Sequence, residues 1–220
     1  MFNIAIDGPA GAGKSSIAKA AAAKLKFIYV DTGALYRSIA LFALKSDIDP
    51  ADSKAVIDLL PKIDLSLAFE DGTQKVILNG EDVSEDIRMP EVSSSASKVS
   101  AIPEVRAFLF DIQQNLAKEN NVLMDGRDIG TVVLPNADLK IFLTASPEER
   151  ARRRQKQLAD KGTIVDFDEL LADINKRDYD DSHREIAPLK PAEDAVYLDT
   201  TEMTFDEVTE KIYSLAKERM

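Results

Sequence analysis

The stretch Gly8-Pro9-Ala10-Gly11-Ala12-Gly13-Lys14-Ser15 decides the fold of this chain. It matches the phosphate-loop pattern G-x-x-x-x-G-K-[ST]. Residues 2–6 before it predict a buried strand, and residues 16–25 after it predict a helix. A glycine turn between a strand and a helix gathers backbone N–H groups at the positive end of the helix dipole. The stretch therefore predicts a site for a triphosphate, and a plain Gly/Ala turn is the alternative.

The residue types in this loop suit ATP and Mg²⁺. Its glycines let the backbone approach a ligand closely. Lys14 would reach the outer phosphates, and the Ser15 hydroxyl would be a ligand of Mg²⁺. The expected ATP-binding residues of the loop are Gly8, Pro9, Ala10, Gly11, Ala12, Gly13, Lys14, Ser15 and Ser16.

The bulk composition limits the classes of function. The chain has 220 residues, which suits one α/β domain with small insertions. It has no cysteine, so disulfides and thiol nucleophiles are excluded. A net charge of −11 argues against a binder of nucleic-acid polymers, while local arginine clusters favour a small anionic substrate. We find no signal peptide and no apolar run near the ~20 residues of a membrane span, and we expect a cytoplasmic monomer.

Five apolar runs alternate with helical patterns, which predicts an α/β fold with a five-stranded parallel sheet. The runs cover residues 2–6, 27–30, 122–124, 139–143 and 196–198. Ligands of such sheets bind beyond the carboxyl ends of the strands. Three segments lie at such ends and are expected to converge on one cleft. They are the phosphate loop, Asp31-Thr32-Gly33 and Asp125-Gly126-Arg127-Asp128.

One segment interrupts the alternation of strands and helices. Residues 64–69 alternate in polarity, Asp71-Gly72 is a turn signal, and residues 75–78 follow, which predicts a β-hairpin. Asn79-Gly80 supplies a second turn, so we expect a small antiparallel meander inserted at about residues 62–100. Helices are predicted near residues 103–118, 148–161, 167–184 and 204–219, and the second and third would form a helical hairpin.

The segment after the second strand predicts a second anion site. Thr32 and Gly33 can open a helix, and Arg37 lies one turn further along. The alternative is a capped helix with a surface arginine.

After the third core strand, Asp125 could hold a water on Mg²⁺, and Arg127 would serve the same cleft. A glycine turn with a local Asp–Arg pair is the alternative there.

Arginines also recur on the two later helices. Arg177, Asp181 and Arg184 fall at i, i+4 and i+7, so a shared helical face is expected. A solvated charged stripe is the competing interpretation, and it applies equally to Arg150, Arg153 and Arg154. His183 is expected to be a surface residue.

With these motifs assembled, the chain resembles the bacterial cytidylate kinases, the CMP kinase branch of the nucleoside monophosphate kinases. The resemblance covers nearly the whole chain and rests on the stretches 6–15, 31–37, 125–133 and 177–189. It implies a three-layer P-loop kinase with a core (1–61 and 101–220), a CMP-binding insertion (about 62–100) and a helical lid (about 150–166).

The same resemblance implies roles for individual residues. Lys14, Arg127 and Arg184 would be catalytic. Arg150 and Arg154 would be lid contacts to ATP, and Ser15 and Asp125, the latter through water, would serve Mg²⁺. The implied CMP-binding residues are Thr32, Arg37, Ser97, Arg106, Arg127, Asp128, Arg177, Asp181 and Arg184.

Base choice also follows from hydrogen-bond chemistry. A carboxylate such as Asp128 accepts from the exocyclic amino group of cytosine, and a guanidinium such as Arg106 donates to its ring acceptors. Uracil places an oxygen where cytosine has the amino group, so Asp128 would repel it.

The reaction that the resemblance implies is reversible transfer of the ATP γ-phosphoryl group to CMP or dCMP. Three alternatives remain at the level of the sequence. One is a phosphate-loop kinase for another acceptor, such as UMP, shikimate or dephospho-coenzyme A. The others are a nucleotide-dependent switch and a module that binds nucleotide without catalysis. The second predicted anion site argues against a switch, which needs only one.

Overall fold

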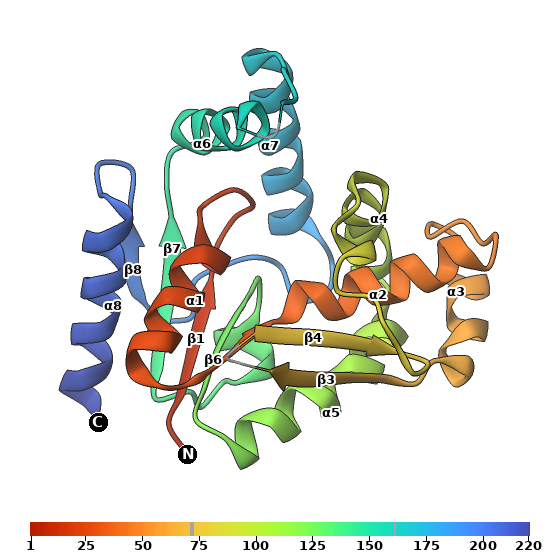
Figure 1. The fold of residues 1–220 in the computed structure, drawn as a ribbon, viewed down its shortest axis with the longest axis horizontal. Coiled ribbons are helices and arrows are strands. Elements are labelled where there is room, and N and C mark those ends of the chain that lie inside the picture. Colours follow the sequence, from red (N-terminus) through yellow and green to blue (C-terminus); the bar gives the residue numbers. More distant parts are fainter. Residues whose placement is uncertain (71–72, 161) are drawn as a thin grey trace. The chain divides into compact units, whose positions relative to one another are not determined.

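The computed structural model describes residues 1–70, 73–160 and 162–220, and Figure 1 shows its ribbon. The chain divides into two compact units. We call Ile28–Asn121, together with Met1, the hairpin unit, and Phe2–Phe27 with Val122–Met220 the loop unit. Across the described ranges, every helix falls short of the length and apolar character that a bilayer crossing needs.

The predicted five-stranded parallel sheet is confirmed. Its strands lie in the order β2(Ile28–Asp31), β6(Val122–Gly126), β1(Asn3–Asp7), β7(Leu139–Thr144) and β8(Val196–Asp199). Within the loop unit, β1 pairs in parallel with both β6 and β7, and Asp7 lies opposite Gly126 and Phe142. The apolar run of β1 is buried throughout, as expected for a strand covered on both faces. The carboxyl ends of β1, β6 and β7 therefore lie at the same edge.

In the described part of the loop unit there are four α-helices, besides the short π-helix Ile129–Val133, and three of the four begin at a residue whose side chain caps the helix. The four are α1(Lys14–Leu25), α6(Pro147–Ala159), α7(Phe167–His183) and α8(Phe205–Arg219). Ser146 caps α6 with Pro147 as its first residue, Asp166 caps α7, and Thr204 forms a capping box with Glu207 at α8. Helices α6 and α7 pack against each other, which confirms the predicted helical hairpin (Figure 1).

The hairpin unit holds the predicted antiparallel meander. Strands β3(Leu65–Glu70) and β4(Thr73–Leu78) pair with Leu65 opposite Leu78, and the short β5(Glu81–Asp82) pairs with β4. The predicted turn at Asp71-Gly72 lies outside the described residues. The helices are α2(Thr32–Lys45), α3(Ser53–Leu59), α4(Pro90–Ser100) and α5(Pro103–Glu119), with 3₁₀ turns at Leu60–Lys62 and Asp86–Arg88.

Helix α4 was not predicted, because its serine-rich sequence favours turns. It forms nonetheless, since Val92 and Val99 are buried on one face while serine hydroxyls bond back to carbonyls of the preceding turn. Tertiary burial thus overrides local preference here.

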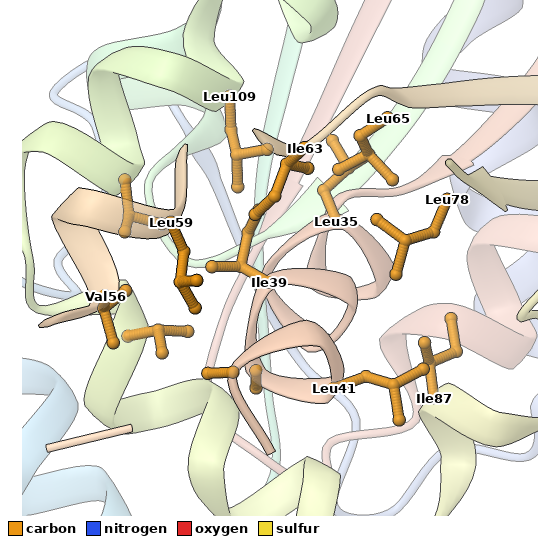
Figure 2. Packing of buried hydrophobic residues seen from close by; sticks show 14 of the residues in the cluster. Leu35, Ile39, Leu41, Val56, Leu59, Ile63, Leu65, Leu78, Ile87 and Leu109 are labelled. Atoms are coloured by element: carbon orange, nitrogen blue, oxygen red, sulfur yellow. The ribbon is translucent and has the colours of Figure 1, made fainter. Parts of the chain in front are cut away.

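The hydrophobic core of the hairpin unit is built around α2 (Figure 2). Leu35, Ile39 and Leu41 project from this helix and are almost completely buried. Side chains from α3, the meander and α5 surround them, among them Val56, Leu65, Leu78 and Leu109. This core reaches beyond the predicted insertion at both ends, since α2 precedes residue 62 and α5 follows residue 100.

Candidate functional site

The phosphate loop connects β1 to α1, and its conformation requires glycine. Gly11 and Gly13 have φ of 74° and 84°, in the left-handed region. At Gly8 an added Cβ would lie 1.9 Å from the Leu143 carbonyl oxygen, so the backbone passes too close to β7 for any side chain. Gly13 is the N-cap of α1, and among the described residues no side chain caps that helix. The N–H groups of its first turn are therefore directed at a ligand site.

Lys14 is buried under this loop, with 6% of its surface exposed. Its ammonium group donates to the Pro9 carbonyl at 2.7 Å, which holds it against the loop. Burial and, to a smaller extent, the positive charge of Arg127 lower the pKa of Lys14 to about 7, against the opposing effects of Asp125 and Asp7. A bound polyphosphate would supply negative charge and raise this pKa again.

Ser15 and Asp125, the residues expected to serve Mg²⁺, contact each other. The Ser15 hydroxyl donates to Asp125 Oδ2 at 2.7 Å, which joins the start of α1 to the end of β6. The carboxylate is buried and the serine is exposed. A hydroxyl beside one carboxylate fits Mg²⁺, which takes few protein oxygens and completes its shell with water and phosphate.

The segment after β6 carries two ion pairs. Arg127 Nε donates to Asp181 Oδ2 at 2.8 Å, and Arg184 Nη2 lies 3.6 Å from Asp128 Oδ1. Asp128 is buried, and Arg127 and Asp181 are half-buried. The structure thus brings together four of the predicted CMP-binding residues of the loop unit.

The predicted shared face of Arg177, Asp181 and Arg184 is wrong for Arg184. Helix α7 ends at His183, and Arg184 has an extended backbone with ψ of 142°. The chain then turns back, with Ala187 at a positive φ and the Leu189 N–H bonded to the Asp181 carbonyl. This turn directs Arg184 to Asp128 and to the Ala187 carbonyl instead of along the helix. Arg177 stays on α7 and is exposed, one turn before Asp181.

Arg150 and Arg154 differ sharply. Arg150 is 2% exposed, and its guanidinium donates to the Ala10 and Ala145 carbonyls and pairs with both oxygens of Asp178. It therefore ties the phosphate loop to both α6 and α7. Arg154 is exposed on α6 and donates to Gln157.

In the hairpin unit, Thr32 and Arg37 lie in the first two turns of α2. Thr32 is buried as the first residue of the helix. Asp31 accepts from the Ala34 N–H, and its other oxygen accepts from Arg37 at 2.7 Å. A Cβ at Gly33 would lie about 3 Å from both side chains, so the glycine makes room for this pair. Arg37 Nε is buried without a hydrogen-bond partner among the described residues.

Ser97 and Arg106 lie on α4 and α5. Ser97 is exposed and its hydroxyl donates to the Ser94 carbonyl. Arg106 is half-buried, donates to the Ser100 carbonyl, and has its guanidinium 5.8 Å from the centre of the Tyr36 ring. His183 is exposed and stacks on Tyr179, which confirms its assignment as a surface residue.

Sequence analysis missed two carboxylates, the buried Asp7 and the half-buried Asp178. Asp7 accepts from the backbone N–H groups of Ile129 and Gly130, each at 2.7 Å. Desolvation raises its pKa to about 6, against the lowering effect of these two hydrogen bonds. Its position at the end of an apolar strand is the sequence signal that could have identified Asp7 as a candidate site residue. Nothing in the sequence pairs Asp178 with Arg150, which lies 28 residues earlier.

Comparison with known proteins assigns a family. The family model "Cytidylate kinase" matches residues 4–218. The chain is 55% identical to a cytidylate kinase of Caldicellulosiruptor bescii over 214 residues, which cover 97% of this chain and 95% of the relative. It is 48% identical to a cytidylate kinase of Lactobacillus johnsonii over 219 residues, covering 100% and 95% of the two chains. An uncharacterized protein from Eubacterium ventriosum shares the fold, with a TM-score of 0.56, 13% identity and full coverage of both chains.

Proposed function

The chain belongs to the cytidylate kinase family, and from this premise we propose how its residues divide the work of phosphoryl transfer. Its function is that of a CMP kinase, an ATP-dependent nucleoside monophosphate kinase that transfers the γ-phosphoryl group of ATP to CMP. The alternatives of a switch, a binding module or a kinase for another acceptor are not favoured. We further propose that the enzyme also uses dCMP and acts in the cytoplasm as a monomer.

The observation that carries the assignment of roles is the buried polar network at the ends of β1 and β6. We propose that the phosphate loop from Gly8 to Ser16 binds ATP, with Lys14 on its outer phosphates. The support is that Lys14 is buried, begins helix α1 and donates to the Pro9 carbonyl of the loop. Arg154, exposed on α6, is proposed as a lid contact to ATP. Arg150 can join it only by exchanging Asp178 for a phosphate.

For the acceptor, we propose that Thr32, Arg37 and Arg127 hold the CMP phosphate. Arg37 and Arg127 each pair with a carboxylate, Asp31 and Asp181. Guanidinium groups bind carboxylate and phosphate in the same forked geometry, so a phosphate can replace the carboxylate.

The remaining contacts concern base, sugar and architecture. Ser97, Arg106 and Asp128 are proposed to read the base, Arg177 and Asp181 to contact the sugar, and Arg184 to contact the phosphates. Residues 62–100 are the proposed CMP-binding insertion, and residues 150–166 are the proposed lid.

The proposed mechanism needs no general base, because the acceptor phosphate is already a competent nucleophile. Lys14, Arg127 and Arg184 neutralise the oxygens of the transferring group in a loose transition state. Mg²⁺, held by Ser15 and through water by Asp125, would supply further positive charge at the phosphates. Exclusion of water by the lid would prevent hydrolysis of ATP without transfer.

The deciding experiment measures ADP release and nucleoside diphosphate formation in parallel with CMP, dCMP, UMP and AMP. We expect CDP in equal amount to ADP, with CMP preferred over UMP by about 100-fold or more in kcat/KM, because a mismatched polar group stays unpaired in the base site. ADP release that does not depend on the acceptor would overturn the proposed division of roles. Preference for UMP would overturn the base contact of Asp128.

A further inference from the structure

Asp7 is the last residue of β1 and has no role in the proposed transfer. It is 4% exposed. Both of its carboxylate oxygens are occupied within the protein. Oδ1 accepts from the Ile129 N–H and Oδ2 from the Gly130 N–H, each at 2.7 Å. These short bonds join the strand that leads into the phosphate loop to the π-helix Ile129–Val133.

The position of these two bonds along the chain is informative. Strand β1 also pairs with β6, with Asp7 directly opposite Gly126. The backbone is therefore held to β1 up to Gly126 and again at Ile129. Only Arg127 and Asp128 lie between these fixed points, and Asp128 has an irregular backbone with φ of −148° and ψ of 26°. Asp7 thus fixes the far end of the two-residue turn that carries the base-reading carboxylate.

We propose that Asp7 is a positioning residue for acceptor selection, which holds the Arg127–Asp128 turn so that Asp128 meets the base of CMP. The proposal rests on the proposed acceptor roles of Arg127 and Asp128. It does not follow from the phosphate-loop motif, which begins one residue later at Gly8.

The requirement for a carboxylate follows from hydrogen-bond chemistry. An ionised carboxylate is acceptor-only, and both of its oxygens receive N–H groups here. An asparagine has the same shape but offers one acceptor and one donor group, so one buried N–H would lose its partner. Gly130 packs closely against this carboxylate, since a Cβ added there would lie 3.3 Å from Asp7 Oδ2 and 3.2 Å from Lys140 Cδ.

The test is Asp7→Asn, assayed for kcat and KM with CMP, UMP and ATP. We expect KM for CMP to rise about tenfold and the CMP-to-UMP ratio of kcat/KM to fall about tenfold, with a smaller rise of KM for ATP, because Asp7 also helps to keep Lys14 protonated. The matched control is Ile6→Val, which removes one methyl group from the preceding, fully buried position of β1. It should lower the melting temperature without changing the CMP-to-UMP ratio.

A second variant covers failure of Asp7→Asn to fold. Gly130→Ala leaves Asp7 intact but crowds Oδ2 and Lys140, and it should produce the same selective loss in smaller degree. Equal increases in both KM values would overturn the proposal in favour of general support of the phosphate loop. An unchanged CMP-to-UMP ratio in both variants would overturn it too.

Asp128→Ala separates this proposal from the proposed function. If Asp128→Ala weakens selection of CMP and Asp7→Asn does not, only the positioning role fails. If neither variant affects the selection, the acceptor roles assigned to the turn fail first.

Discussion

The loop unit and the hairpin unit hold their proposed binding residues in different ways. In the loop unit, Asp7, Lys14, Asp125 and Asp128 are buried at or close to the ends of parallel strands, and hydrogen bonds across more than a hundred residues of sequence hold Asp7 and Asp125. In the hairpin unit, Arg37, Ser97 and Arg106 lie on helix surfaces over an apolar core, and each has a hydrogen-bond acceptor at most six residues away. The first arrangement is fixed in place before ligands arrive, and the second depends on side chains that can exchange partners.

The largest effect is expected from Lys14→Ala. Removal of this buried charge should lower kcat by about 10³-fold or more, because the transition state loses a preorganised cation. The circular dichroism spectrum should stay unchanged, because the backbone of the loop is set by its glycines. The ADP-release assay measures the loss.

Lys24→Ala is the matched control, since Lys24 is an exposed lysine on the same helix, paired with Glu210. Its turnover should equal that of the unchanged enzyme. A Lys14→Ala enzyme with near-normal turnover would contradict the expectation that the largest effect comes from the loop unit.

Base selection gives a direct test between the units. Asp128→Ala should lower kcat/KM for CMP by about 100-fold, because it removes a buried charged acceptor and frees Arg184. Arg106→Met keeps the apolar stem beside Tyr36 and should cost about tenfold, since a half-exposed guanidinium is easier to replace. Parallel kinetics with CMP and UMP measure both.

Neither substitution should change ATP binding by more than about twofold. If Arg106→Met lowered kcat/KM for CMP more than Asp128→Ala did, burial of the side chain would not explain which unit contributes more to base selection.

The pKa of Lys14 predicts a pH dependence of nucleotide binding. In the free protein this pKa is lowered to about 7, so the amine is largely neutral at pH 8, and phosphates must restore its proton on binding. The affinity for ATP should therefore fall by up to about tenfold per pH unit above pH 7 and be flat below it. In the same range the free folded protein gains stability as pH rises, because the unfolded chain binds more protons at Lys14.

Titration calorimetry between pH 6 and 8.5 measures this affinity. Lys14→Arg is the control, since arginine stays charged throughout this pH range. The titration of ATP itself affects both proteins equally, so it drops out when their pH slopes are compared. Identical pH slopes for the two proteins would contradict the lowered pKa.

The smallest effect is expected from Thr32→Ser in the hairpin unit. Both residues offer a hydroxyl at the start of α2, so KM for CMP should change by less than about twofold. Thr32→Val, which keeps the shape without the hydroxyl, is the informative partner. If it too left KM unchanged, Thr32 would have no part in phosphate binding.

Whether an element could be predicted from the sequence depended on how far apart along the chain the interacting residues are. The phosphate loop, the parallel sheet, the β3–β4 hairpin and the α6–α7 pair were all predictable, because glycine spacing, apolar runs and turn signals act within a few residues. Helix α4 was not predictable, since only its tertiary burial outweighs five serines that favour turns.

By itself the sequence determined the glycine turn of the phosphate loop and the places of the sheet strands, the β3–β4 hairpin and the α6–α7 pair, because backbone conformation and local hydrogen bonds are set by neighbouring residues. Only the tertiary structure decided that Arg150 is buried against Asp178, that Arg184 leaves its helix to meet Asp128, and that Asp7 fixes the turn after β6. Those contacts join residues separated by 28 to 122 positions. These contacts form only when surfaces from distant parts of the chain are buried against each other, and no pattern of neighbouring residues in the sequence predicts which surfaces these are.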